Sequence, residues 1–298
     1  MLDSKSQVLV TFWGTRGSIS TPGRLTEKYG GNTPCISVHY LDKFLIFDAG
    51  TGIRNLGLKL IEESDKSGNR ISYDIFLSHT HWDHIQGLPF FEPAYCKNTK
   101  LNIYGSPGKG NFLTSILKGQ MDYEYFPVKM SEVGADINIY GLSGKAINLS
   151  SGTVDWYEQT CHPGGSVSYR LKFNGKTIVY ATDVELDYFF SSKSSGQKSK
   201  TAANDYFNFI AGADLLIADG QYTEEEYPLK IGWGHTSIPV LLRIACESKV
   251  KQLAVFHHDP KHSDKFLDEL WIKNRSCYCS EHVKMNIFWA REGMTLAV

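Results

Sequence analysis

The chain has 298 residues, with 31 Lys and Arg against 32 Asp and Glu, so its formal net charge is −1 at pH 7. An apolar fraction of 42% is typical of a globular protein, and the length fits one α/β domain as readily as two average domains. A near-neutral balance disfavours long nucleic acid as a partner, because proteins that hold phosphate backbones by bulk electrostatics carry a basic excess.

The sequence also predicts where the protein resides. No apolar run reaches the length that a membrane helix needs, and residues 1–6 contain no apolar signal core. The six cysteines are scattered, which favours reduced thiols over a disulfide framework. We therefore expect a cytoplasmic protein with no membrane partner.

In the first half of the chain we expect short strands and one helix. The strands are rich in β-branched and aromatic residues and are bounded by turn-forming residues, over 8–13, 36–40, 44–48 and 75–77. Residues 51–64 carry apolar side chains at helical spacing. Residues 101–149 read as an aromatic-rich insertion.

The second half repeats this alternation. Strands are predicted at 168–173 and 177–181 around the hairpin signal Asn174-Gly175, and again at 215–218 and 252–256. A helix is predicted over 239–248, with Pro239 in its first turn. The Ser/Lys-rich stretch 191–201 reads as a flexible surface loop. Interleaved strands and helices in both halves favour two sheets packed together with helices outside.

Four ligand-type residues fall within six positions directly after a predicted strand, namely His79, His81, Asp83 and His84. Imidazole and carboxylate are the ligands that borderline divalent metals such as zinc select. On an extended segment His79 and His81 project to the same side, and a turn after them would bring Asp83 and His84 toward a second ion nearby. A single histidine near a strand end is usually structural, but this density predicts a metal site.

The pattern resembles the signature of the metallo-β-lactamase fold hydrolases, and the resemblance covers nearly the whole chain. It implies an αββα sandwich of two mixed β-sheets flanked by helices, with 1–298 forming a single domain. It also implies three further ligands at predicted strand ends, His162, Asp183 and His257. One ion would be held by His79, His81 and His162, the other by Asp83, His84 and His257, with Asp183 bridging. Two divalent ions are thus implied, for which the histidines favour Zn²⁺, with Mn²⁺ or Fe²⁺ as alternatives.

Segments 12–18, 29–33 and 232–237 resemble one phosphodiesterase branch of these hydrolases, which includes ribonuclease Z and cyclic-nucleotide phosphodiesterases. In that branch the equivalent of His235 contacts the phosphate and helps to protonate the leaving group, and the equivalent of Asp219 orients it. For both residues, strand-end and helix-cap polarity is the alternative. Asp83 would also contact the nucleophilic water as general base. Arg16 and Thr236 are weaker candidates for substrate contact.

We therefore expect an enzyme, a dinuclear metal-dependent phosphodiesterase that hydrolyses a small phosphodiester, such as a 3′,5′-cyclic nucleotide, by attack of metal-bound hydroxide. The alternative within the branch is ribonuclease Z-like tRNA 3′-processing, against which stand the charge of −1 and the lack of a recognisable Gly/Pro-rich arm. An ester, thioester or lactone hydrolase of the same fold and a non-catalytic metal-binding module are further alternatives. Dimers are common in the branch, so a homodimer is expected by analogy.

Overall fold

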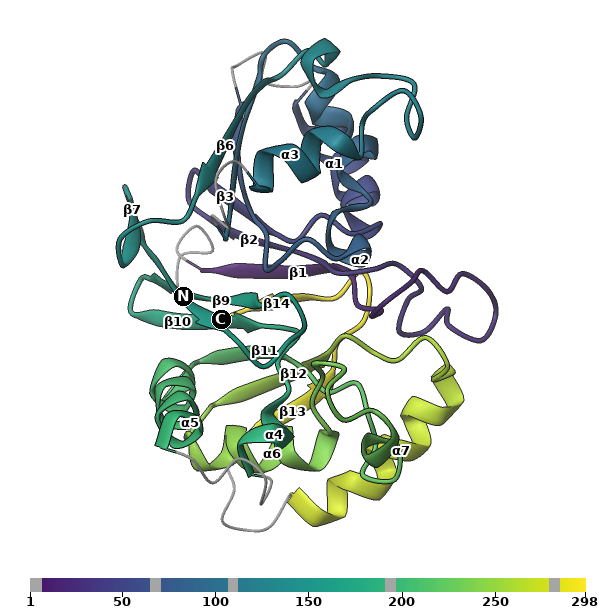
Figure 1. Ribbon diagram of the computed structural model, residues 1–298, viewed down its shortest axis with the longest axis vertical. Coiled ribbons are helices and arrows are strands. Elements are labelled where there is room, and N and C mark those ends of the chain that lie inside the picture. Colours follow the sequence, from purple (N-terminus) through teal and green to yellow (C-terminus); the bar gives the residue numbers. More distant parts are fainter. Residues whose placement is uncertain (1–6, 65–70, 107–111, 191–196, 279–284) are drawn as a thin grey trace. The chain divides into compact units, whose positions relative to one another are not determined.

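The computed structural model describes residues 7–64, 71–106, 112–190, 197–278 and 285–298 (Figure 1). Over these ranges the chain divides into two compact units, which are described separately. The first unit comprises residues up to 21, 30–144 and 291–297, and the second comprises 22–29, 145–290 and 298. Each unit has its own sheet and its own buried core. The single-domain organisation over 1–298 stays a prediction.

The first unit contains, within the described ranges, a mixed sheet of seven strands in the order β14-β1-β2-β3-β4-β5-β6. Antiparallel ladders join β14 through β3, and parallel ladders join β3 through β6. The strands are β1 (Leu9–Gly14), β2 (Cys35–Tyr40), β3 (Lys43–Phe47), β4 (Ile71–Phe76), β5 (Thr99–Gly105), β6 (Asp136–Gly141) and β14 (Thr295–Ala297). The strands predicted in the first half of the chain are therefore present, within one residue at each end, except that β4 begins four residues earlier than predicted.

Helix α1 (Gly52–Ser64) packs against this sheet through the apolar face that the helical spacing of its side chains predicts. Ile53, Leu56 and Leu60 on that face are buried. The other helical elements of the unit are short, namely α2 (Trp82–Ile85), η2 (Leu88–Phe90), η3 (Glu92–Tyr95), α3 (Phe112–Gly119) and η4 (Met130–Glu132).

The range 101–149, expected as an insertion, contains most of β5 and all of β6, so much of it belongs to the sheet. Strand β5 shows the alternation of a half-buried strand, because Leu101 and Ile103 are buried and their neighbours are not. Within the same range, β7 (Ala146–Leu149) belongs to the sheet of the second unit. The prediction of an insertion is therefore wrong for β5, β6 and β7, which belong to the two sheets.

The second unit contains, among its described residues, a mixed sheet of seven strands in the order β13-β12-β11-β10-β9-β8-β7. Its strands are β7, β8 (Gly152–Gln159), β9 (Ser166–Phe173), β10 (Lys176–Ala181), β11 (Leu215–Asp219), β12 (Gln252–Phe256) and β13 (Asn286–Trp289). Ladders from β7 to β10 are antiparallel, and those from β10 to β13 are parallel. Asn174 and Gly175 have φ of 50° and 72°, the left-handed values that the predicted two-residue hairpin requires.

The helices of the second unit are α4 (Leu186–Phe190), α5 (Gln197–Ile210), α6 (Ile238–Glu247), α7 (Asp264–Tyr278) and the short η6 (Tyr227–Leu229). Helix α6 follows Ser237 and carries Pro239 in its first turn, as predicted. Of the loop expected at 191–201, residues 191–196 lie outside the described residues, and residues from Gln197 onward are helical. Tyr206 and Ile210, one turn apart and both buried, anchor α5 to the core, and the helix extends back into the Ser/Lys-rich stretch.

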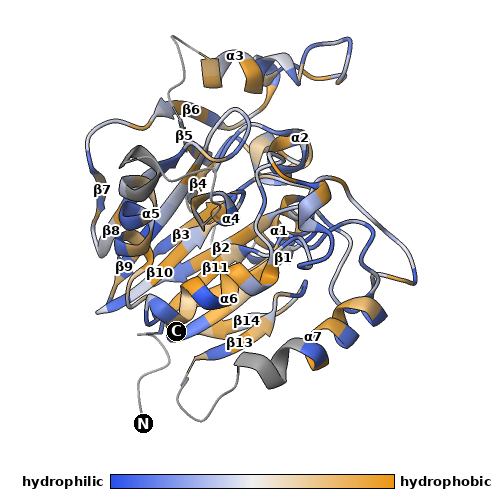
Figure 2. Ribbon diagram, turned by 60° about the horizontal axis from the view of Figure 1, so that its bottom comes forward, coloured by the Kyte–Doolittle hydropathy of each residue, from blue (hydrophilic) through white to orange (hydrophobic). Residues whose placement is uncertain are grey.

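Two mixed sheets with flanking helices confirm the predicted α/β class. Strand β11, which buries all five residues, is hydrophobic along most of its length (Figure 2). Among the described residues, no helix combines the length and the apolar character needed to cross a membrane. In each sheet, the carboxyl ends of neighbouring parallel strands share one edge, so residues that follow these strands are brought close together.

The backbones around Gly87 and Gly50 approach closely, which generates a prediction about stability. A Cβ atom on Gly87 would lie 2.0 Å from the Gly50 carbonyl oxygen. We expect Gly87→Ala to lower the free energy of unfolding by about 1–3 kcal/mol, since a buried backbone segment must shift. Urea unfolding followed by circular dichroism measures this change. Gly119→Ala is the control, because no atom lies within 4 Å of its Cβ position; equal midpoints for the two variants would contradict the prediction.

Candidate active site

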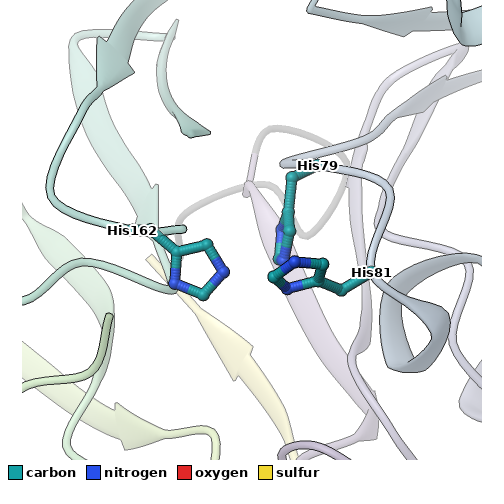
Figure 3. A group of neighbouring side chains, drawn as sticks. All are labelled: His79, His81 and His162. Atoms are coloured by element: carbon teal, nitrogen blue, oxygen red, sulfur yellow. The ribbon is translucent and has the colours of Figure 1, made fainter. Parts of the chain in front are cut away.

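In the first unit, four of the predicted metal donors follow β4: His79 and His81 lie between β4 and α2, and Asp83 and His84 lie in α2. His79 and His81 lie side by side with ring centroids 4.4 Å apart (Figure 3). Helix α2 begins directly after His81, whose backbone is extended, and so turns Asp83 and His84 back toward the same region. The Nε2 atom of His84 lies 3.2 Å from Oδ2 of Asp83. The close spacing in sequence is therefore also a cluster in space.

Asp48, the first residue after β3, orients one of these donors. Its Oδ2 atom lies 2.7 Å from Nδ1 of His84, and its carboxylate also accepts hydrogen bonds from the backbone N–H and hydroxyl of Ser78 at 2.7 and 2.8 Å. An ionised carboxylate only accepts hydrogen bonds, so the His84 ring donates through Nδ1 and keeps the lone pair on Nε2. No local sequence pattern marks Asp48, because its histidine partner lies 36 positions further along the chain.

The loop after β1 supports this cluster. The backbone N–H of Ser18 donates a hydrogen bond of 2.8 Å to Oδ2 of Asp83. Arg16, a predicted substrate contact, is fully buried, and its Nε donates to the Gly30 carbonyl oxygen at 3.0 Å. These contacts give Arg16 a structural place in the first unit, and its contact with substrate stays a prediction.

In the second unit, two histidines face the carboxylate of Asp183. The Nε2 atom of His257 lies 3.4 Å from Oδ2 of Asp183, and that of His162, also drawn in Figure 3, lies 3.9 Å from Oδ1. All three residues are buried. Asp183 and His257 follow β10 and β12, and their φ values of 58° and 59° are left-handed, a strained conformation that is concentrated at functional sites. The arrangement suits a carboxylate shared between two ions.

Hydrogen bonds fix the tautomers of these two rings. Nδ1 of His257 lies 2.8 Å from Oε1 of Gln221, and Nδ1 of His162 lies 3.0 Å from the Gly234 carbonyl oxygen. Because both partners are acceptors, each ring donates from Nδ1 and directs the lone pair of Nε2 toward Asp183. A lone pair aimed at a carboxylate oxygen is repulsive unless a cation lies between them or the ring takes a second proton. The donor set therefore fits divalent metals.

His235 differs from the histidines that are predicted to bind metal. Its Nδ1 donates to Oδ2 of Asp219 at 2.8 Å, and its ring stacks on His257 with centroids 5.0 Å apart. The donor atoms of Asp183, Asp219, His235 and His257 all lie within 4.8 Å of one another. Burial raises the pKa of the Asp219 carboxyl well above its usual range, against the opposing influence of His257. The contact between Asp219 and His235 that the resemblance implies is thus present.

Two neighbouring polar residues have structural contacts. Thr236, a predicted substrate contact, is fully buried, accepts a hydrogen bond of 3.0 Å from the backbone N–H of Leu186 and donates to the Val184 carbonyl oxygen. Thr236 therefore ties the segment that carries the catalytic histidine candidate to the start of α4. His258, next to His257 in the chain, hydrogen bonds through Nε2 to the Ala290 carbonyl oxygen at 2.8 Å.

Comparison with known proteins places the chain among hydrolases. The family model described as the Beta-lactamase superfamily domain matches residues 44–258. A protein named ribonuclease Z from Staphylococcus carnosus is 29% identical over 299 residues, covering 90% of this chain and 94% of the relative. Ribonuclease Z from Thermoplasma acidophilum is 25% identical over 293 residues, covering 87% and 89% of the two chains.

Among solved structures, the metallo-β-lactamase fold protein YhfI from Bacillus subtilis has the same fold. It aligns with a TM-score of 0.65 at 16% identity, covering 98% of this chain and all of the other. The fold predicted from the histidine signature is therefore confirmed.

The Asp48 contacts generate a prediction about metal affinity. Asp48→Asn keeps the shape of the side chain but cannot accept from both Ser78 and His84 as the carboxylate does. Removing an outer partner of a ligating histidine typically weakens metal binding about 10- to 100-fold, and we expect a loss of that size here. Competition with a chromogenic zinc chelator measures it. Asp74→Asn, on β4, removes a carboxylate that accepts a hydrogen bond from Asn102 and should leave the affinity unchanged; equal affinities in all three proteins would show that Asp48 does not support a ligand.

Proposed function

The chain belongs to the β-lactamase superfamily as a metal-dependent hydrolase of the metallo-β-lactamase fold, and we propose that it cleaves phosphodiester bonds. The observation that carries this proposal is the pair His235–Asp219, held at 2.8 Å beside Asp183 and His257. Phosphodiester cleavage builds negative charge on a leaving oxygen, and a histidine held at Nδ1 by a carboxylate is suited to deliver a proton to it.

We assign the metal donors as His79, His81, Asp83, His84, His162, Asp183 and His257. A bound divalent metal polarises the phosphoryl group and lowers the pKa of water, for which a histidine-rich donor set favours zinc over manganese or iron. His235 holds its proton for the leaving group at Nε2, since Nδ1 is engaged by Asp219. Asp83, whose carboxylate is oriented by Ser18, accepts a proton from the attacking water.

The first candidate substrate is the 3′ side of a precursor RNA. The relatives named ribonuclease Z align over most of both chains, which favours an RNA phosphodiester. This ordering reverses the expectation from the sequence alone, in which a small cyclic phosphodiester came first. A homodimer remains the expected assembly by analogy.

A small phosphodiester is the second candidate, because of one connection in the second unit. Strands β9 and β10 lead from His162 toward Asp183, and the two-residue turn Asn174-Gly175 joins them. That connection therefore provides no arm of the kind that tRNA-processing members of the branch use to hold their substrate. The net charge of −1 also favours a small substrate, whose negative charge the residues of the site can neutralise without a basic protein surface.

A substrate panel tests the proposal. Metal-replete protein is assayed on a precursor tRNA, cyclic AMP, bis-p-nitrophenyl phosphate and a thioester, each with and without chelator. We expect phosphodiester cleavage that the chelator abolishes, and the larger kcat/KM identifies the natural class. Cleavage of the thioester alone would establish the ester-hydrolase alternative, and metal binding without any turnover would establish a non-catalytic module.

The role of His235 can be tested separately. We expect His235→Ala to lower kcat for phosphodiesters about 100-fold or more while metal content stays the same. His262→Ala is a matched control, because His262 is also buried and paired with a carboxylate, lying 2.9 Å from Glu226. Unchanged turnover in the His235 variant, measured with metal analysis of the same sample, would exclude its role as the acid.

A further inference from the structure

The loop that leads to His235 exposes large apolar side chains. Leu229, Ile231 and Trp233 are 83%, 59% and 57% exposed. The ammonium group of Lys230 lies over the Trp233 ring, 3.7 Å from its centroid, and the ring nevertheless keeps most of its surface in solvent. Neither Lys230 nor Trp233 is among the residues that we assign to metal binding or proton transfer. An exposed indole with a cation beside it is suited to contact a ligand that is both aromatic and anionic.

A buried carboxylate holds the backbone of this loop. Glu185 accepts hydrogen bonds from the Tyr227 hydroxyl at 2.6 Å, from the Gly232 N–H at 2.8 Å and from the Gly234 N–H at 3.1 Å. These donors lie on both sides of Trp233 in the chain. Moving the indole into the interior would break hydrogen bonds to a charged and buried acceptor, so the loop keeps the ring at the surface.

The two glycines that flank Trp233 reinforce this geometry. Gly232 and Gly234 have φ of +87° and +88°, in the region that favours glycine. A Cβ on Gly234 would also lie 2.2 Å from Nδ1 of His162. Trp233 is two residues from His235, so their Cα atoms are at most about 7 Å apart. The backbone that carries the exposed ring is therefore close to the backbone of the proposed proton donor.

We infer that Trp233 and Lys230 form a platform for a nucleotidyl unit, with the indole stacking on a base and the ammonium contacting an adjacent phosphate. Every base offers a π-face, and stacking on an aromatic side chain does not depend on base identity. The shared chemistry is a base next to a phosphate, supplied by an RNA end or by a free nucleotide. The inference rests on the proposed function for the position of the cleaved bond, but base binding itself does not require turnover.

Two substrates, one with a nucleoside and one with a methyl group in its place, test the platform by kinetics. Thymidine 5′-(p-nitrophenyl phosphate) and methyl p-nitrophenyl phosphate have the same leaving group, and only the first carries a base. We expect Trp233→Ala to raise KM for the thymidine ester about ten-fold, with kcat within two-fold and with no change for the methyl ester. Trp233→Phe should restore most of the affinity. Lys230→Met should raise KM for both esters, since both carry the phosphate.

Leu229→Ala is the matched control, because it removes an exposed apolar side chain from the same loop without removing an aromatic ring. It should leave both KM values unchanged. An equal effect of Trp233→Ala on the two esters, or no effect on either, would overturn the platform. Repeating the comparison with cyclic AMP and with a short oligoribonucleotide distinguishes a free nucleotide from an RNA end by which substrate loses more kcat/KM.

A binding measurement separates this inference from the proposed function. Calorimetric titration with thymidine 5′-monophosphate and with deoxyribose 5-phosphate requires no hydrolysis. We expect the wild-type protein to bind the nucleotide about ten-fold more tightly and the Trp233→Ala variant to bind both equally. Base-dependent binding without phosphodiester cleavage would support the platform and refute the proposed function. Cleavage with base-independent binding would support the function and refute the platform.

Discussion

The local structure of the candidate site depends on imidazole lone pairs that face carboxylate oxygens. His84 faces Asp83 in the first unit, and His257 and His162 face Asp183 in the second. In each case a hydrogen bond at Nδ1 prevents the ring from relieving the repulsion by changing its tautomer. The fold therefore holds an arrangement that only added positive charge stabilises, which is the physical requirement of a metal centre.

Both sheets place an aspartate at the same position relative to their strands. In each, antiparallel ladders give way to parallel ones, and the first strand with a parallel partner is followed by an aspartate in the left-handed region, Asp48 with φ of 60° and Asp183 with φ of 58°. The two aspartates have different contacts, because Asp48 accepts a hydrogen bond from a ligand histidine while Asp183 faces two lone pairs. Equivalent positions at strand ends thus hold a histidine through a hydrogen bond in one unit and provide the proposed metal donor in the other.

Features that a few adjacent residues encode could be predicted from the sequence, whereas contacts between residues far apart in the chain could not. The dense cluster around His79 and the hairpin turn at Asn174 were readable because a few adjacent residues specify each one. Asp48 and Gln221 were missed because their partners lie 36 positions away, and no local pattern marks such a contact. The burial of Arg16 was likewise unpredictable, since a glycine-rich loop has the same sequence whether its arginine points outward or inward.

The rigidity of the loop that carries Trp233 has a consequence for the energetics of ligand binding. Glu185 and the flanking glycines order this segment when the chain folds, so its backbone entropy is lost once, during folding. A ligand that stacks on the indole meets a preorganised surface and orders little of the protein on arrival. Affinity at such a surface depends mainly on the contacts themselves, because binding costs little further ordering of the protein.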